Sequence, residues 1–157
     1  MPKKNRQMVV LIDYENISRQ AIMEGKILDF KKFRDELLEI GNIDFAFVFI
    51  YPDMFYGLPE ITDLGFEIIA CPKRTVETYK IEDTVDIHII RIGLKLLRYK
   101  EITDIVIVSN DRHMAEIIKE AKNHGKTVHL FGTKSVSSSL KKILESSDLK
   151  EIPLKEN

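Results

Sequence analysis

The sequence has one cysteine and no long apolar run, and each shortage excludes a class of protein. The lone Cys71 excludes an internal disulfide and a cysteine-based zinc site, and it fits a reducing compartment. No apolar stretch approaches ~20 residues, so we expect no membrane span. The basic start at 1–7 precedes too few apolar residues for a signal peptide. We therefore expect a cytoplasmic protein with no membrane partner.

An excess of either charge is also lacking. Lys and Arg total 24 and Asp and Glu total 25, for a net charge of -1. The chain has no overall positive charge of the kind that attracts nucleic acid. This weakens the interpretation as a simple nucleic-acid-binding protein, but it is compatible with an enzyme that has a local basic patch. The 157 residues are 44% hydrophobic. They predict a single domain over 1–157, with its core at about 8–150 between a short basic and a polar tail.

Short apolar runs alternate with amphipathic stretches along the chain. The runs are rich in Val, Ile and Phe and nearly continuous, as in strands buried on both faces of a parallel sheet. They lie at 8–12, 45–50, 66–70, 104–109 and 126–132. Stretches with helical spacing lie at 29–41, 82–99, 111–125 and 135–148. This order predicts an α/β fold, a doubly wound three-layer sandwich whose central, mainly parallel sheet has about five strands. The residues at 150–157 are expected to form a short, partly frayed end.

Polar residues gather where the predicted strands end, and in open α/β sheets sites form at that edge. Those after the first and fourth runs are Asp13, Glu15, Asn16, Ser109, Asn110, Asp111 and His113. If these two strands are neighbours, Asp13 and Asp111 lie side by side. A third acid, Asp86, borders the buried face of the helix predicted at 82–99. A favourable interaction with the helix dipole explains Glu82 and Asp83 better than Asp86, because Asp86 lies about a turn inside the predicted helix.

Three converging carboxylates would repel one another unless a cation lay between them, and oxygen-rich clusters suit Mg²⁺ or Mn²⁺. Such ions orient phosphate and activate water for hydrolysis. Helix capping is the alternative for Asp13, Asn16 and Asp111, and spacing alone leaves both open. The position of His113 in a first helical turn favours a surface histidine over a ligand.

A basic stretch contains Lys73, Arg74 and Lys80. Basic loops are usually only solvated, but beside a carboxylate cleft these residues would supply the phosphate contacts of a nucleic acid. The aromatic residues Tyr14, Tyr51, Phe55 and Tyr56 would either stack bases or pack loops. The aromatic residues at 51–56, if exposed, would also suit an interface between two copies of the chain, so the sequence is compatible with a homodimer.

Four segments, in order, resemble the NYN domain family. "VVLIDYENIS" resembles its hydrophobic strand ending in D-x-x-N, and "TVDIHIIRIGLKLL" its K-x-V-D-x-x-L helix. "DIVIVSNDRHMAEIIKEAKNHGKTVHLFG" resembles its strand–S-G-D-S-D-F–helix–G-K-x-V–strand segment. "SVSSSLKKILESSD" resembles its closing helix, so the match spans residue 8 to about 150.

The resemblance implies a PIN-like nuclease fold and metal-dependent cleavage of RNA at clustered aspartates. By position, Asp13 and Asn16 match the first motif, Asp86 the helix motif and Asp111 the first aspartate of S-G-D-S-D. At the motif's second aspartate this chain has His113.

Two further positions depart from the family pattern. The motif's glycine is Asn110, and the helix-motif lysine aligns near Asp83. His113 either replaces the missing acid, since histidine can bind Mn²⁺ or act as an acid–base group, or marks a lost metal. Asp53 and Glu15 are further candidates to fill the gap.

The leading hypothesis is a Mg²⁺- or Mn²⁺-dependent endoribonuclease. Asp13, Asp86 and Asp111 would ligate the metal, with His113 as a fourth candidate, and Asn16 would orient Asp13 or contact the scissile phosphate. The predicted substrate contacts are Ser109, Asn110, Lys73, Arg74 and Lys80. The alternatives are a module that binds RNA or a protein without cleaving, and a phosphatase or receiver-like phosphoacceptor, for which Lys134 would be the lysine after the last strand.

Overall fold

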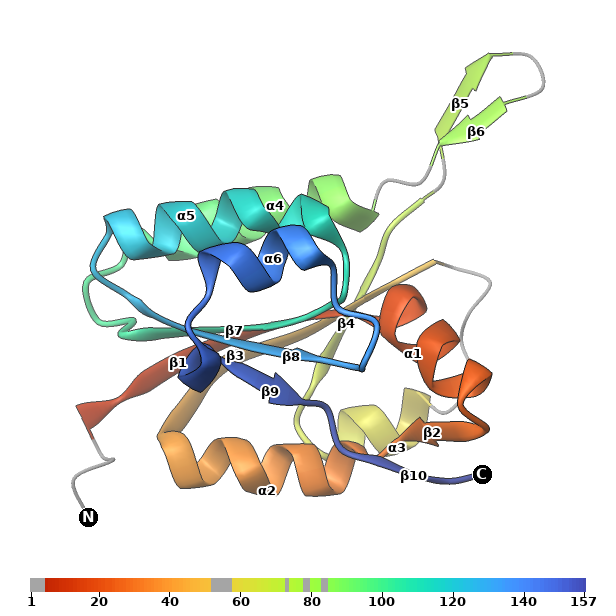
Figure 1. Cartoon of the computed structure of the whole chain (residues 1–157), viewed down its shortest axis with the longest axis horizontal. Helices are drawn as coiled ribbons and strands as arrows, with labels where there is room; N and C mark the ends of the chain where they lie inside the picture. Colours follow the sequence, from red (N-terminus) through yellow and green to blue (C-terminus); the bar gives the residue numbers. More distant parts are fainter. Residues whose placement is uncertain (1–4, 52–57, 73, 78–79, 83–84) are drawn as a thin grey trace.

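The structure is a computed structural model that describes residues 5–51, 58–72, 74–77, 80–82 and 85–157 (Figure 1). A six-stranded sheet in the order β4-β3-β1-β7-β8-β9 forms its centre, and each neighbouring pair of strands is parallel. These strands are β1 (Gln7–Asp13), β3 (Asn42–Ile50), β4 (Glu67–Ala70), β7 (Asp104–Val108), β8 (Thr127–Gly132) and β9 (Leu149–Glu151).

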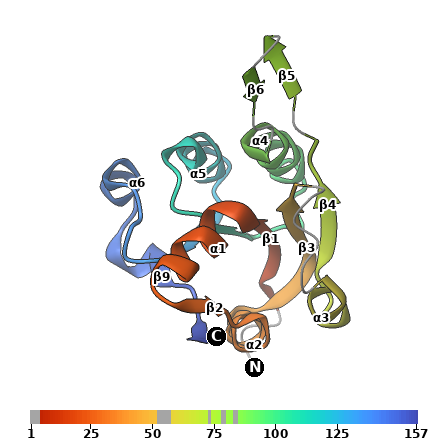
Figure 2. The ribbon, with the colours of Figure 1, turned by 90° about the vertical axis from the view of Figure 1, so that its right-hand side faces the viewer.

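Helices cover both faces of this sheet (Figures 1 and 2). The helices on one face are α4 (Val85–Leu96), α5 (Ala115–Asn123) and α6 (Ser138–Ile143), and those on the other are α1 (Tyr14–Met23), α2 (Phe30–Ile40) and α3 (Leu58–Asp63). Short 3-10 helices are η2 (Arg112–Met114) and η3 (Ser146–Asp148). Two small antiparallel sheets pair β2 (Lys26–Leu28) with β10 (Leu154–Glu156), and β5 (Arg74–Glu77) with β6 (Lys80–Glu82).

The alternation of side chains along β1 divides the core into two halves. Val9 and Leu11 belong to the core beneath α4 and α5, whereas Met8, Val10 and Ile12 belong to the core of α1 and α2. All five are almost wholly buried, as expected for a central parallel strand covered on both faces. By the same alternation Asp13 follows Leu11 toward the α4 and α5 face.

The predicted three-layer α/β fold with a mainly parallel sheet is confirmed. The five predicted strands coincide with β1, β3, β4, β7 and β8 to within a few residues. The sixth strand, β9, was not predicted, and the end expected to fray instead forms β9 and β10. The short helix α3 and the strand β2 were also missed.

One helix boundary was predicted wrongly at a place that matters for the site. The helix expected from residue 82 begins at Val85, and Glu82 belongs to strand β6. Asp86 is therefore in the first turn of α4, not a turn inside it. Among the described residues, no helix is long and apolar enough to cross a membrane.

Candidate metal centre

The predicted neighbours β1 and β7 do lie side by side, with Ile12 opposite Val108. Asp13 ends β1 and Ser109 directly follows β7, so both side chains lie at the carboxyl edge of the sheet. They contact each other, since the Ser109 hydroxyl donates to Asp13 Oδ2 at 3.0 Å. Asp13 is only 4% exposed.

Asp86, Asp111 and His113 form a compact cluster, and its two carboxylates are close enough to Asp13 to raise the pKa of that residue. One ligand atom from each lies within 4.8 Å of the other two. His113 Nδ1 is 2.8 Å from Asp111 Oδ1 and 3.2 Å from Asp86 Oδ2. The three side chains are 28%, 25% and 56% exposed in the order Asp86, Asp111, His113, so the cluster is open to solvent.

Local structure explains why Asp111 and His113 meet. Asp111 is the N-cap of η2, and its Oδ1 accepts a hydrogen bond from the His113 backbone N–H at 3.0 Å. The capping alternative for Asp111 is thus correct, but the same oxygen also contacts the imidazole. His113 is exposed, as its first-turn position predicted, yet it lies against two acids.

Ser109 connects the buried acid to the open cluster. While its hydroxyl donates to Asp13, its oxygen accepts from the Asp111 backbone N–H at 3.1 Å. Asn16 reinforces this connection, because its Oδ1 accepts from the Asn110 backbone N–H at 2.8 Å. The start of α1 is thereby joined to the segment that carries Asp111.

Asn110, which stands where the family motif has glycine, is buried and bonded to the end of β8. Its Nδ2 donates to Thr133 Oγ1 at 2.7 Å, and its Oδ1 accepts from the Thr133 backbone N–H at 2.9 Å. Thr133 was missed in the sequence analysis, although it follows a predicted strand at the same sheet edge. Ser109 and Asn110 are 0% and 6% exposed. Their contact with a substrate stays a prediction.

The environment of Asp13 disfavours its charge. Burial raises its pKa most, the nearby carboxylates of Asp86 and Asp111 raise it further, and the Ser109 hydroxyl opposes them, leaving a pKa of about 7. A cation bound near these carboxylates would favour the ionised form. This is the electrostatic signature expected of a site that holds positive charge.

The donor set of the cluster fits a divalent cation. Ligands placed ~2.0–2.6 Å from a shared ion lie no more than about 5 Å apart, and the ligand atoms of Asp86, Asp111 and His113 meet this condition. Carboxylates suit Mg²⁺ and Mn²⁺, whereas imidazole suits the transition metals. The set therefore matches Mn²⁺ better than Mg²⁺.

Other predicted residues lie elsewhere or outside the description. Arg74 and Lys80 belong to β5 and β6, whose hairpin projects beyond the start of α4 (Figure 2), and their side chains are not described. Lys73 lies outside the described residues, as do Asp53, Phe55 and Tyr56. Glu15 forms an ion pair with Arg19. Tyr51 is buried.

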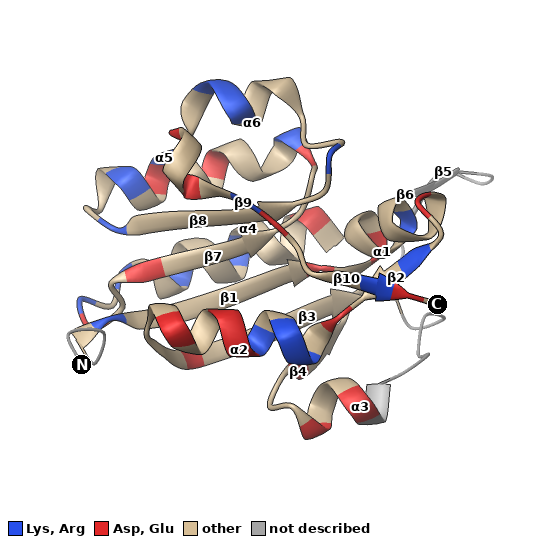
Figure 3. Ribbon diagram, turned by 60° about the horizontal axis from the view of Figure 1, so that its bottom comes forward, with Lys and Arg blue, Asp and Glu red and all other residues tan. Residues whose placement is uncertain are grey.

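Charge is mixed over the described surface. Figure 3 shows both signs on α2, with the basic residues toward one end of the helix and the acidic residues toward the other, and shows acidic residues on α3 and basic residues on α6. Lys134, the lysine of the phosphoacceptor alternative, is exposed, and no ion pair joins it to Asp13 among the residues described. The phosphoacceptor alternative therefore gains no support from Lys134.

Comparisons with known proteins agree with the fold. A family model described as the NYN domain matches residues 7–147. The crystal structure of a protein of unknown function from Vibrio parahaemolyticus RIMD 2210633 is similar, with a TM-score of 0.83 and 14% identity. The match covers 95% of this chain and 94% of that one. At this identity the likeness concerns the fold alone. A search of curated proteins finds no significant match.

Proposed function

The chain belongs to the NYN domain family, whose members are nuclease-like modules, and from this premise we propose that it is a divalent-metal-dependent nuclease acting on RNA. One observation carries the proposal: ligand atoms of Asp86, Asp111 and His113 lie within 4.8 Å of one another. The proposed substrate is RNA, in keeping with the family. Homodimer formation and a cytoplasmic location stay predictions.

Asp86, Asp111 and His113 would hold the cation, whereas Asp13, the other predicted ligand, is not in the group of residues whose ligand atoms lie within 4.8 Å of one another. When bound, a divalent cation polarises the phosphate and lowers the pKa of an attacking water, which is the chemistry that phosphodiester hydrolysis needs. We propose Mn²⁺ in preference to Mg²⁺ because one ligand is an imidazole. The role of His113 is then that of a replacement for the acid of the family motif.

The remaining polar residues at this edge would position the ligands. Ser109 holds Asp13 and the backbone of Asp111, and Asn16 and Asn110 tie the same segment to α1 and β8. Residues that fix metal ligands from behind typically matter 10–100-fold (an order-of-magnitude range) for affinity or activity. The hairpin β5–β6, beside the start of α4, would carry Arg74 and Lys80 toward the substrate backbone.

The test is cleavage of a mixed-sequence single-stranded RNA with Mn²⁺ or Mg²⁺. We expect the wild-type chain to cut in Mn²⁺, and Asp111→Asn to lose at least about 100-fold in rate because a charged ligand is removed. The matched control is Asp35→Asn, which makes the same chemical change in an exposed acid ion-paired to Lys31 on α2. It should cut as wild type does.

A non-cleaving RNA- or protein-binding module is the second candidate. It is favoured by the contact of His113 Nδ1 with both carboxylates, because a protonated imidazole would supply the positive charge that the cluster needs without a metal. RNA that stays intact at high protein concentration, with wild type and Asp111→Asn alike, would refute the nuclease. RNA binding retained in that case would favour the module.

A further inference from the structure

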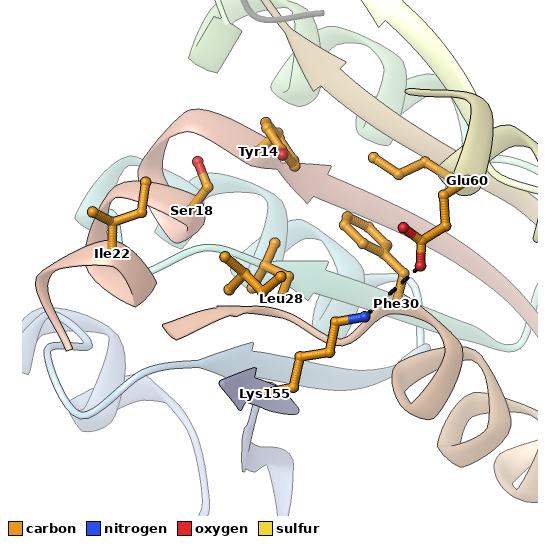
Figure 4. Close-up of a pocket in the computed structure, with 9 residues that line it drawn as sticks. Tyr14, Ser18, Ile22, Leu28, Phe30, Glu60 and Lys155 are labelled. Atoms are coloured by element: carbon orange, nitrogen blue, oxygen red, sulfur yellow. Dashed lines mark ion pairs between the residues drawn. The ribbon is translucent and has the colours of Figure 1, made fainter. Parts of the chain in front are cut away.

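A pocket distinct from the acidic cluster lies on the α1 and α2 side of the sheet (Figure 4). It has a volume of about 220 Å³ and is bounded by α1, β2, the start of α2, α3 and β10. The residues that line it are Tyr14, Ser18, Ile22, Ile27, Leu28, Phe30, Glu60, Ile61 and Lys155. The proposed nuclease chemistry uses none of them.

The walls of this pocket are apolar and aromatic. Tyr14 and Phe30 stack with their rings 6.2 Å apart and an angle of 21° between planes. Ile22 lies at the mouth and is 67% exposed, a large apolar side chain left in solvent by the fold. For scale, a cavity of roughly 150 Å³ accommodates benzene, so the larger pocket here has room for the two fused rings of a purine.

The rim of the pocket carries paired polar groups. Glu60 and Lys155 lie across from each other, with Oε1 and Nζ 3.8 Å apart, and both side chains are well exposed (Figure 4). An ion pair this long and this exposed contributes little to stability. Both groups therefore keep hydrogen-bonding capacity for a ligand whose edge faces the pair.

Two consecutive residues, Asp13 and Tyr14, link the region of the proposed metal centre to this pocket. Tyr14 follows Asp13, and the two side chains lie in different halves of the molecule, Asp13 beside Ser109 and Tyr14 against Phe30. A single strand passing the acidic cluster at the carboxyl edge of the sheet would reach the pocket within a short stretch. Proteins read single-stranded RNA by stacking splayed bases on aromatic rings and bonding their edges.

We infer that this pocket binds one unstacked base of the RNA strand, guanine in preference to adenine; the inference rests on the proposed RNA-directed function. Guanine presents two adjacent N–H donors and a carbonyl oxygen on its Watson–Crick edge. The Glu60 carboxylate can accept from both donors while the Lys155 ammonium donates to the carbonyl. Adenine offers only one donor group there, and no carbonyl.

The experiment measures binding without cleavage, in EDTA, on the intact chain. The probes are three pentamers with uridine at four positions and guanosine, adenosine or an abasic site at the centre. Chemical shifts of the Ile22, Ile27 and Ile61 methyl groups report ring currents in the pocket. We expect the guanosine pentamer to move them and to bind about tenfold tighter than the abasic one, which is ~1.4 kcal/mol and within the range of base–aromatic stacking.

Two variants and a control localise the effect. Ser18→Phe fills the pocket and should abolish the advantage of guanosine over the abasic site. Glu60→Gln should remove the preference for guanosine over adenosine, while Asp35→Asn, which removes the same charge from α2, should keep it. Both acids are well exposed, so we expect these two variants to fold.

Pentamers that bind equally with and without the central base, and leave the three methyl groups unmoved, would overturn the inference even if the chain cuts RNA in Mn²⁺. Methyl shifts that grow with protein concentration in the absence of RNA would also overturn it, by assigning the pocket to a second copy of the chain. Base-dependent binding by a chain that leaves RNA intact would support the pocket while refuting the nuclease.

Discussion

Two buried aspartates at opposite ends of the central strands have opposite electrostatic surroundings. Asp13 ends β1 beside other acids, and its pKa is about 7. Asp104 begins β7, where burial would raise its pKa, but hydrogen bonds from His129, Arg6 and Thr103 outweigh burial and lower it to about 2. His129 Nε2 lies 2.7 Å from Asp104 Oδ2. The surroundings of Asp13 disfavour its ionised form in the absence of a cation. The surroundings of Asp104 favour its ionised form, which stabilises the fold.

The first prediction is that Asp13→Asn stabilises the metal-free chain at pH 8. The folded chain retains a proton on Asp13 that the unfolded chain releases, so this stability is complete below pH 3.8 and is lost as pH rises through about 7. The full effect is on the order of 4 kcal/mol, at 1.36 kcal/mol per pKa unit. We expect a gain of about 1–3 kcal/mol at pH 8 and almost none at pH 4, measured by urea unfolding.

Asp104→Asn is the matched control and should act with the opposite sign. Its folded-state pKa of about 2 lies below the ordinary 3.8, so its stabilisation is present above pH 3.8 and disappears as pH falls through about 2. At pH 8 the variant should lose about 2 kcal/mol or more. Equal losses in both variants at pH 8 would show that Asp13 is an ordinary structural carboxylate.

At the scale of elements, the C-terminal segment is the clearest difference from the sequence prediction. Residues expected to fray form β9 beside β8 and β10 beside β2. Between them Ile152 is 5% exposed, and its backbone N–H donates to the Gly132 carbonyl at 2.9 Å. These strands have three residues each and pair with distant partners, so no local periodicity marks them.

The element-scale prediction is that Ile152→Ala costs about 2–4 kcal/mol of unfolding free energy, because it opens a cavity in the α1 and α2 core. Glu156→Ala, in an exposed position of the same segment, should change stability by less than about 0.5 kcal/mol. Urea unfolding at neutral pH gives both values. A loss at Ile152 no larger than at Glu156 would mean that the segment is frayed after all.

For the whole molecule, the sequence allowed the layers and the site edge to be predicted. Continuous apolar runs alternating with helices require a buried parallel sheet, and its carboxyl edge collects whatever follows the strands. Asp13 and Asp111 could be placed near each other because β1 and β7 are neighbours. Asp86 could be named as a third acid because it borders the buried face of a predicted helix, and the family resemblance supported it, although spacing alone could not orient that helix.

What could not be predicted depends on tertiary geometry. The turn of His113 toward Asp86 requires η2 and the start of α4 to lie side by side, and the sequence favoured a surface histidine. The Glu60–Lys155 rim joins residues 95 positions apart on α3 and β10. Such contacts between distant segments leave no periodic trace in the chain.

The central claim is that Asp86, Asp111 and His113 form a cation site, and electron paramagnetic resonance of Mn²⁺ tests it most directly. Bound Mn²⁺ loses the sharp six-line signal of the free ion, so a titration counts ions held per chain. We expect one Mn²⁺ per chain for wild type and Asp35→Asn, and none at the same concentrations for Asp111→Asn. An undiminished free-ion signal with wild type, or equal binding by Asp111→Asn, would contradict the account.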